Sequence, residues 1–307
     1  MFSRIVVPLD HSDVSEAALP LAADLARRRG IPMVLVHVLE MSPEFTAYVH
    51  GVSEADALIE LEQSSQQYLN RLAGDIEGVE VSTIVLRGQP ARRLVEYVDD
   101  LDDSLVVMSS HGRSGFRQLL LGSVTARVVQ VSSAPVIVVR ASEEGSDIQI
   151  PKQIRRVLVP LDGSAFAEHA LHAVYELVTR KDVEIHLVRV PEVVAYPSTM
   201  YGAASYETVD TYMQAMRTES EEYLVRKSEE LKEHQGSVSW EVRDGATSTA
   251  ILEAAKDFNA DLIAIASHGR TGFRRFLLGS VAEQVLHHAT VPVMMVGPHD
   301  VEDGEAE

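Results

Sequence analysis

The pattern of apolar and polar positions alternates short β-branched apolar runs with longer amphipathic stretches along the chain. Runs such as Ile5–Leu9 and Met33–Leu39 are almost entirely apolar, as expected of strands that are buried on both faces. The stretches between the runs place apolar residues at helical spacing. This alternation predicts an α/β fold with parallel sheets, because parallel neighbouring strands need a crossover, usually a helix, between them.

The predicted elements form two sets that follow one another in the chain. Each set predicts a doubly wound, five-stranded parallel sheet of order 3-2-1-4-5, with right-handed crossovers and helices on both faces. The first set has strands Ile5–Leu9, Met33–Leu39, Glu80–Leu86, Leu105–Ser109 and Val136–Arg140, with helices Ser15–Arg29, Ala55–Leu72, Pro90–Asp99 and Ser123–Val131. The second has strands Val157–Leu161, Glu184–Val190, Val238–Val242, Leu262–Ala266 and Val293–Val296, with helices Ala165–Val178, Tyr212–His234, Ser248–Asp257 and Ser280–His288.

The two sets are copies of one unit. Residues 111–139 return in similar form as residues 268–296, and the segment that begins at Arg4 returns from Arg156. A period of about 150 residues is too long for a solenoid repeat and fits an ordinary domain. We therefore predict two similar domains, residues 1–141 and 154–297. They are joined by a polar linker, residues 142–153, and followed by an acidic tail, residues 298–307.

Composition excludes several function classes. The chain has 46 acidic and 27 basic residues and a net charge of −19, which argues against nucleic acid as a partner because phosphate neutralisation needs a basic face. The absence of cysteine excludes disulfides, thiolate metal sites and a cysteine nucleophile. The apolar stretch at the N-terminus is too short for a membrane helix and lacks the features of a signal peptide. These features predict a cytoplasmic protein with no membrane partner.

Two glycine-rich turns recur at identical spacing in both copies. In copy one, Gly112 follows the fourth strand and the pair Gly122-Ser123 opens the next helix; in copy two the matching residues are Gly269 and Gly279-Ser280. Glycines let backbone N–H groups approach a phosphate, and a helix start adds free amides and the positive end of the dipole. The motif is neither a P-loop nor a dinucleotide fingerprint. The alternative is a simple chain reversal in which the serines are N-caps.

Asp10 and Asp162 each follow the first strand of their copy in a Pro-Leu-Asp turn. In the order 3-2-1-4-5, strands 1 and 4 lie side by side at the topological switch point, so these aspartates should face the glycine turns. There a carboxylate could accept a hydrogen bond from a ribose or base, or hold a divalent ion through water. An Asx cap for the following helix explains the same residue equally well.

The segments between the two glycines of each copy, here called the glycine intervals, contain arginines with two possible interpretations: contact with phosphate, or an ordinary solvated surface. Histidines beside the first glycines are interpreted as turn-stabilising rather than catalytic, because no orienting partner can be singled out for them. The arginines are Arg113, Arg117, Arg270, Arg274 and Arg275, and the histidines are His111 and His268.

Taken together, these segments resemble the universal stress protein family in its tandem form. The resemblance rests on the openings VVPLD and VLVPLD, the strand ends HVLE and RVPE, the SHGR turns and the helix start LLGSV, and it covers nearly the whole chain, once per copy. The nucleotide-binding branch of the family carries the pattern Gly-x2-Gly-x9-Gly-Ser/Thr. The resemblance therefore implies ATP or AMP as ligand, with Mg²⁺ as a possible companion.

Carried over by position, the resemblance implies roles for individual residues. Asp10 and the backbone of Val38 would meet ribose and adenine, and the serines and glycines would hold the phosphates and ribose. The implied nucleotide-binding residues are Pro8, Leu9, Asp10, Val38, Met108, Ser109, Gly112, Gly122, Ser123 and Val124 in the first copy, and Pro160, Leu161, Asp162, Val190, Ile265, Ala266, Gly269, Gly279, Ser280 and Val281 in the second.

One departure from the family pattern bears on affinity. Ser109 and Ala266 stand where the pattern has its first glycine, and a Cβ there could crowd the ligand or deny a positive φ. We expect weakened rather than abolished binding, with Ala266 no better than Ser109. The family also pairs domains through their last strands, which implies that Val136–Arg140 and Val293–Val296 meet in an intramolecular pseudo-dimer; further homodimerisation is compatible with this.

The sequence thus favours an adenine-nucleotide-binding regulator of the stress response, not an enzyme beyond slow ATP hydrolysis, with a protein partner of unknown identity. The alternative is an interaction module of the same fold that works without nucleotide. A nucleotidyl transferase is disfavoured because its paired-histidine signature, His-x-Gly-His, is absent.

Overall fold

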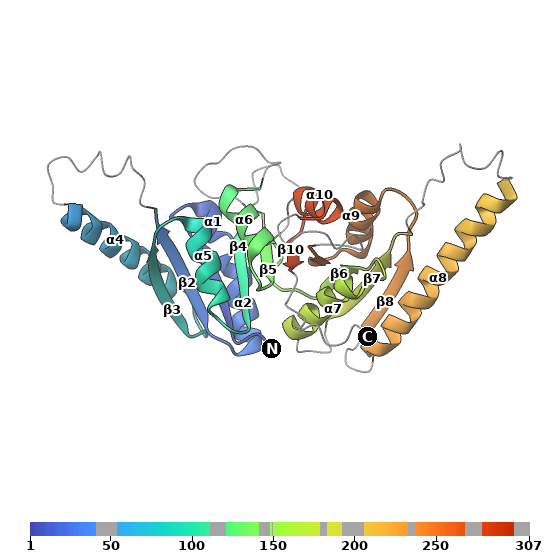
Figure 1. Ribbon diagram of the computed structural model, residues 1–307. Helices are drawn as coiled ribbons and strands as arrows, with labels where there is room; N and C mark the ends of the chain where they lie inside the picture. The colour runs from blue at the N-terminus through green and yellow to red at the C-terminus, as the bar shows by residue number, and fades with distance from the viewer. Residues whose placement is uncertain are drawn as a thin grey trace, which may run out of the picture.

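The computed structural model describes residues 1–40, 54–110, 121–140, 148, 150–178, 183–191, 206–232, 237–267 and 278–297, with only the backbone described for residues 54–55 and 206–210. Its strands form one ten-stranded sheet of order β3-β2-β1-β4-β5-β10-β9-β6-β7-β8 (Figure 1). The strands are β1 Arg4–Leu9, β2 Met33–Leu39, β3 Val81–Arg87, β4 Ser104–Ser109, β5 Val136–Val139, β6 Arg156–Pro160, β7 Glu184–Arg189, β8 Ser237–Val242, β9 Leu262–Ala266 and β10 Val293–Val296. The helices are α1 Asp13–Glu16, α2 Leu19–Arg29, α4 Glu54–Gly74, α5 Pro90–Asp99, α6 Ser123–Val131, α7 Ala165–Leu177, α8 Tyr206–Lys232, α9 Thr247–Phe258 and α10 Ser280–His288.

The sheet consists of two similar halves, a first half up to residue 140 and a second half from residue 150. Within the first half the order is β3-β2-β1-β4-β5, and the second half repeats it as β8-β7-β6-β9-β10. All neighbouring strands inside a half are parallel. The predicted doubly wound order 3-2-1-4-5 is therefore confirmed in both halves. The residue limits given above for domains, linker and tail stay a prediction.

The last strands of the two halves join the sheet at its centre. β5 and β10 pair antiparallel, with Ile137 opposite Met294 and Val138 opposite Val293. All of these side chains are at least 99% buried. The predicted pairing of the last strands is confirmed, and it removes two open sheet edges.

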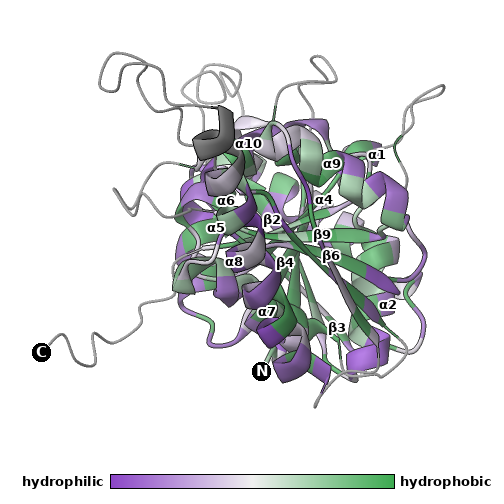
Figure 2. Cartoon of the chain, turned by 90° about the vertical axis from the view of Figure 1, so that its right-hand side faces the viewer, coloured by the Kyte–Doolittle hydropathy of each residue, from purple (hydrophilic) through white to green (hydrophobic). Residues whose placement is uncertain are grey.

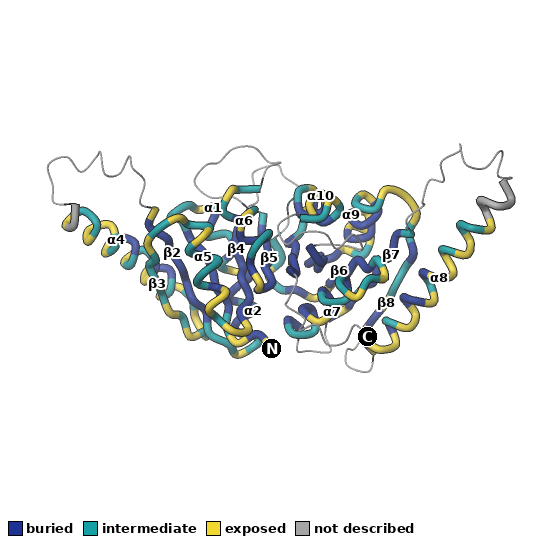
Figure 3. Tube along the Cα trace, in the orientation of Figure 1, coloured by how far each residue is buried: buried dark blue, intermediate teal, exposed yellow. Residues whose placement is uncertain are grey.

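Helices cover both faces of the sheet and make two apolar layers. The strands are apolar along most of their length (Figure 2), and burial is concentrated where helices meet strands (Figure 3). One layer includes Leu21 of α2, Leu69 of α4, Val174 of α7 and Leu224 of α8. The other includes Leu94 of α5, Val128 of α6, Ile251 of α9 and Val285 of α10. Among the described residues, no helix is long and apolar enough to cross a membrane.

The first predicted helix is wrong in one respect. Instead of a single helix over Ser15–Arg29, the chain forms α1 and α2 with a break at Ala17 and Ala18. Pro20, in the first turn of α2, lacks an N–H and its ring would collide with the carbonyl of Glu16 in a continuous helix. The matching residue of the second half is His172, and α7 runs through it without interruption. Helix α8 also begins earlier than predicted, at Tyr206 rather than Tyr212.

Polar contacts add to the strand pairing between the halves. Arg140 follows β5, and its Nη1 donates to the carbonyl oxygens of His287 at 2.7 Å and Ala289 at 3.3 Å. Those carbonyls belong to the C-terminal end of α10, which otherwise leaves acceptors unsatisfied. The N-terminal ammonium also lies 3.2 Å from Glu176 Oε1 in α7, but both groups are exposed, so this pair contributes little.

Candidate functional site

The predicted site residues gather where β1 and β4 end. These strands are parallel neighbours, so their carboxyl ends lie at the same edge of the sheet. Pro8, Leu9 and Asp10 are at the end of β1, and Met108 and Ser109 end β4. In the second half, Pro160 ends β6 and is followed by Leu161 and Asp162, while Ile265 and Ala266 end β9. Each half therefore has the topological switch point at which α/β proteins bind ligands.

Each aspartate stabilises the turn into the helix that follows it. Asp10 Oδ1 accepts hydrogen bonds from Ser12 N at 3.1 Å and from Ser12 Oγ at 2.5 Å, and Ser12 Oγ in turn accepts from Ser15 N. The second half repeats this arrangement with Asp162, Ser164 and Ala167 N. The Asx-cap interpretation thus accounts for Oδ1 of both aspartates. The two serines were not predicted, although the repeated Asp-x-Ser spacing was a signal for them.

The second glycine turn lies against the end of β4. Gly122 N donates to Ser110 O at 2.8 Å, and the matching bond from Gly279 N to Ser267 O is also 2.8 Å. These bonds hold the first residues of α6 and α10 beside the strand ends. The structure therefore places a glycine-led helix start at the same sheet edge as the aspartate turn, in both halves.

The conformation of these turns corrects two expectations. Gly122 and Gly279 are themselves the N-caps, with φ of −59° and −62°, and Ser123 and Ser280 occupy the first helical position rather than the cap. Any residue adopts such a φ, so the backbone angle does not require glycine. Among the described residues, the non-glycine residues with positive φ are His11, Asp103 and Asn259. A denied positive φ is therefore no obstacle at Ser109 or Ala266.

Thr125 holds the end of β4 in the first half and was not predicted. Its Oγ1 donates to Ser109 O at 2.8 Å, and both residues are buried. The matching position in the second half is Ala282, which has no hydroxyl. The first half thus restrains the carbonyl before its glycine turn with a side chain, whereas the second half lacks this bond.

Aromatic rings lie beside the aspartate turn of the first half. His11, at φ 67°, stacks on Tyr68 with ring centroids 4.0 Å apart and meets the edge of His37 at 4.6 Å. His37 is buried and its Nδ1 donates to Leu9 O at 2.7 Å. Burial, followed by a hydrogen bond to Glu16, raises the pKa of Tyr68 well above its usual value. Tyr68 is therefore neutral at physiological pH.

The second half has different side chains at the matching positions. Gly163 replaces His11 and takes φ 86°. Arg189 replaces His37; its side chain is only 4% exposed, lies over the Tyr223 ring at 5.0 Å and pairs with Glu219 at 3.3 Å. Tyr223 donates to Glu168, and burial together with this bond raises its pKa. The two sites thus share their turns but differ in charge and in aromatic lining.

Comparison with known proteins decides the family. Residues 1–140 and residues 153–297 each match the sequence model of the universal stress protein family. The chain belongs to the universal stress protein family. A universal stress protein of Mycolicibacterium smegmatis is 28% identical over 302 residues, covering 96% of this chain and 97% of that protein.

Two further likenesses agree with the tandem arrangement of universal stress protein units. A universal stress protein of Methanocaldococcus jannaschii is 32% identical over 142 residues, covering 46% of this chain and 83% of that protein. The crystal structure of a universal stress protein from Archaeoglobus fulgidus matches with a TM-score of 0.70 at 23% identity, over 96% of this chain and 98% of that chain. The latter likeness shows the fold of the whole chain.

Not every predicted site residue of this universal stress protein lies in the described part. Gly112 and Gly269, the two histidines before them and the five arginines of the glycine intervals lie outside the described residues. Of the apolar predictions, Val38, Val190, Met108 and Ile265 are buried, whereas Val124 and Val281 are partly exposed. No group of three or more described histidines, aspartates or glutamates is placed to hold a metal ion.

Proposed function

We propose that each half binds the adenylate part of ATP or AMP at the carboxyl ends of its first and fourth strands. Occupancy, rather than turnover, would then regulate a protein partner in the stress response. One observation carries the proposal: an aspartate turn and a glycine-led helix start occupy the same sheet edge at a topological switch point, and they do so twice.

The roles follow from the chemistry of the groups. The first amides of α6 and α10 present N–H groups and the positive end of a helix dipole, which suit phosphate. The carboxylates of Asp10 and Asp162 suit ribose hydroxyls as acceptors, since Oδ1 holds the turn and so fixes the orientation of the carboxylate. Val38 and Val190 would meet adenine through their backbone, and Mg²⁺ would accompany the phosphates.

We further propose that the first half binds at least as tightly as the second. Thr125 fixes the Ser109 carbonyl, whereas Ala282 leaves the carbonyl of Ala266 without such a bond. A site that is ordered before binding loses less entropy when its ligand arrives. This agrees with the expectation that Ala266 is no better than Ser109 as a replacement for glycine.

The test combines release and titration of nucleotide. Mass spectrometry of the purified protein after denaturation should detect ATP or AMP, and added nucleotide should raise the melting temperature by mass action, corresponding to about 2.7 kcal/mol at a hundredfold excess over Kd. Gly122→Val should remove most of the shift by placing a side chain at the helix start, and Gly279→Val should have the smaller effect.

Gly74→Ala is the matched control, because a Cβ at Gly74 meets nothing within 4 Å and its φ is ordinary. It should leave the nucleotide-induced shift unchanged. No shift at millimolar ATP or AMP, with or without Mg²⁺, would instead favour a nucleotide-independent interaction module.

A further inference from the structure

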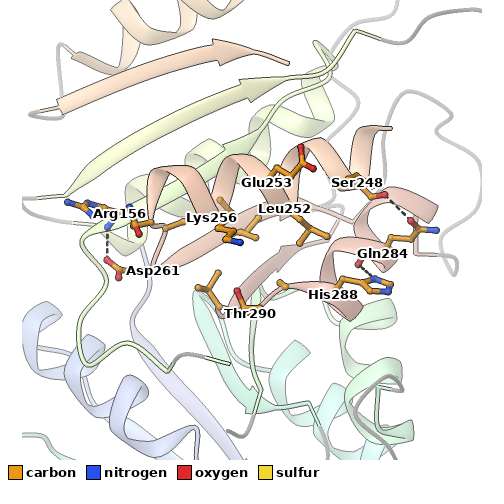
Figure 4. A pocket seen from close by; sticks show the side chains of 16 residues that line it. Arg156, Ser248, Leu252, Glu253, Lys256, Asp261, Gln284, His288 and Thr290 are labelled. Carbon is orange, nitrogen blue, oxygen red and sulfur yellow. Dashed lines mark hydrogen bonds between the residues drawn. The ribbon is translucent and has the colours of Figure 1, made fainter. Parts of the chain in front are cut away.

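A groove of about 740 Å³ lies between α9 and α10 of the second half, within the size range of small-molecule sites (Figure 4). Its lining includes the apolar side chains Leu252, Ala255, Ile263 and Val291, together with Lys256 and Thr290. It is separate from the nucleotide site proposed above, because it includes none of the strand-end residues assigned there.

The corresponding helices of the first half are tied together. Asp99, the last residue of α5, accepts hydrogen bonds from Ser133 N at 3.1 Å and Ser133 Oγ at 2.8 Å in the turn after α6. In the repeated sequence, Lys256 stands where Asp99 does and Thr290 where Ser133 does. An ammonium group donates and cannot accept, so this tie cannot form in the second half.

The floor of the groove is also built from smaller residues. Ala254 and Ala255 stand where the first half has Tyr97 and Val98. Both alanines are buried, at 0% and 7% exposure, but only Ala255 lines the groove, so the floor lacks the side-chain volume by which the matching valine of the first half exceeds alanine. The groove between α9 and α10 is thus explained by the absence of the Asp99–Ser133 type of hydrogen bond and by the smaller side chain at its floor.

The charges around the groove leave Lys256 available. Asp261 accepts the backbone N–H groups of Arg155 and Arg156 at 2.8 and 2.9 Å. His288 Nδ1 donates to the carbonyl oxygen of Gln284 at 2.9 Å. Lys256 has no ion pair with a described residue, and in Figure 4 it lies on the side of α9 that faces Thr290. Glu253 is also part of the lining, but its carboxylate points to the opposite side of α9 from Thr290. The rim therefore presents a cation beside a hydroxyl, above an apolar floor.

We infer that this groove binds a small organic carboxylate with an apolar body. The carboxylate accepts from the ammonium of Lys256 and the hydroxyl of Thr290, since charge-assisted hydrogen bonds are the strongest that such a rim can offer. The apolar body covers Leu252, Ala255 and Val291 and removes their surface from water. The site does not depend on nucleotide binding.

Calorimetric titration of the full chain with sodium octanoate tests the inference, with octylammonium chloride as a probe of the same length and opposite charge. Octanoate should bind and octylammonium should not. Lys256→Met should weaken octanoate binding at least about tenfold, as loss of a charge-assisted bond does. Ala255→Val, which restores the side chain of the first half, should weaken it as well by filling the floor.

Lys232→Met is the matched control, because it removes an exposed lysine of α8 outside the groove lining. It should bind octanoate as the wild type does, and circular dichroism should show all variants folded. The inference is overturned if the wild type does not bind octanoate, if octylammonium binds equally well, or if Lys256→Met and wild type bind alike.

Discussion

At the scale of single residues, Asp10 shows how one side chain can serve both fold and function. Its Oδ1 fixes Ser12, which caps α1, and the same carboxylate lies at the edge where a nucleotide is proposed to bind. An asparagine retains the Oδ1 acceptor but loses the charge, whereas an alanine loses both. The two substitutions therefore separate the structural role of the carboxylate from its role toward a ligand.

We predict that Asp10→Ala lowers the free energy of unfolding by about 0.5–2 kcal/mol, the usual cost of losing a helix-capping interaction, while Asp10→Asn stays close to wild type. Asp10→Asn should still weaken ATP binding, because an amide NH₂ then faces the ribose in place of a carboxylate oxygen. Urea unfolding and nucleotide titration measure the two effects. Equal losses of stability in both variants would contradict the assigned turn.

At the scale of elements, matched positions in the two halves show what a helix tolerates. Pro20 and His172 correspond, and only the helix with the proline is broken. We predict that His172→Pro lowers the free energy of unfolding by about 3 kcal/mol, because the proline ring would collide with the carbonyl of Glu168 inside a continuous helix. His172 is exposed, so His172→Ala should be nearly neutral and serves as the control. Urea unfolding of both variants measures the difference, and equal stabilities would contradict the predicted collision inside α7.

The elements also show how far the sequence predicts this molecule. The strand order was predicted correctly from the alternation of apolar runs and amphipathic stretches, whereas the pairing of the last strands was implied only by the family resemblance. The break before Pro20 was missed because apolar periodicity continues across it. In the candidate site, the aspartate and glycine turns were expected at one sheet edge, but their contacts were not predicted. Thr125 of α6 donates to Ser109 at the end of β4, a contact between residues far apart in the sequence that no local pattern encodes.

At the scale of the whole molecule, the two halves share one sheet, and α10 of the second half also contacts the first half. Its first residues form the proposed phosphate end of the second site, and its last carbonyls accept from Arg140 of the first half. Gly297 of the second half occupies the position that Arg140 has in the first half. An added Cβ at Gly297 would lie 3.0 Å from Ser132 O at the end of α6. The seam, meaning the paired strands β5 and β10 with the residues that follow them, is thus polar at Arg140 and tightly packed at Gly297.

We predict that Arg140→Ala lowers the free energy of unfolding by about 1–3 kcal/mol, because the carbonyls of His287 and Ala289 lose a charged donor in a partly buried place. Arg127→Ala is the matched control, since Arg127 is exposed on α6. Urea unfolding followed by circular dichroism measures both variants. If Arg140→Ala were as stable as Arg127→Ala, the carbonyls at the end of α10 would have to be satisfied by water, and strand pairing with apolar packing alone would hold the seam.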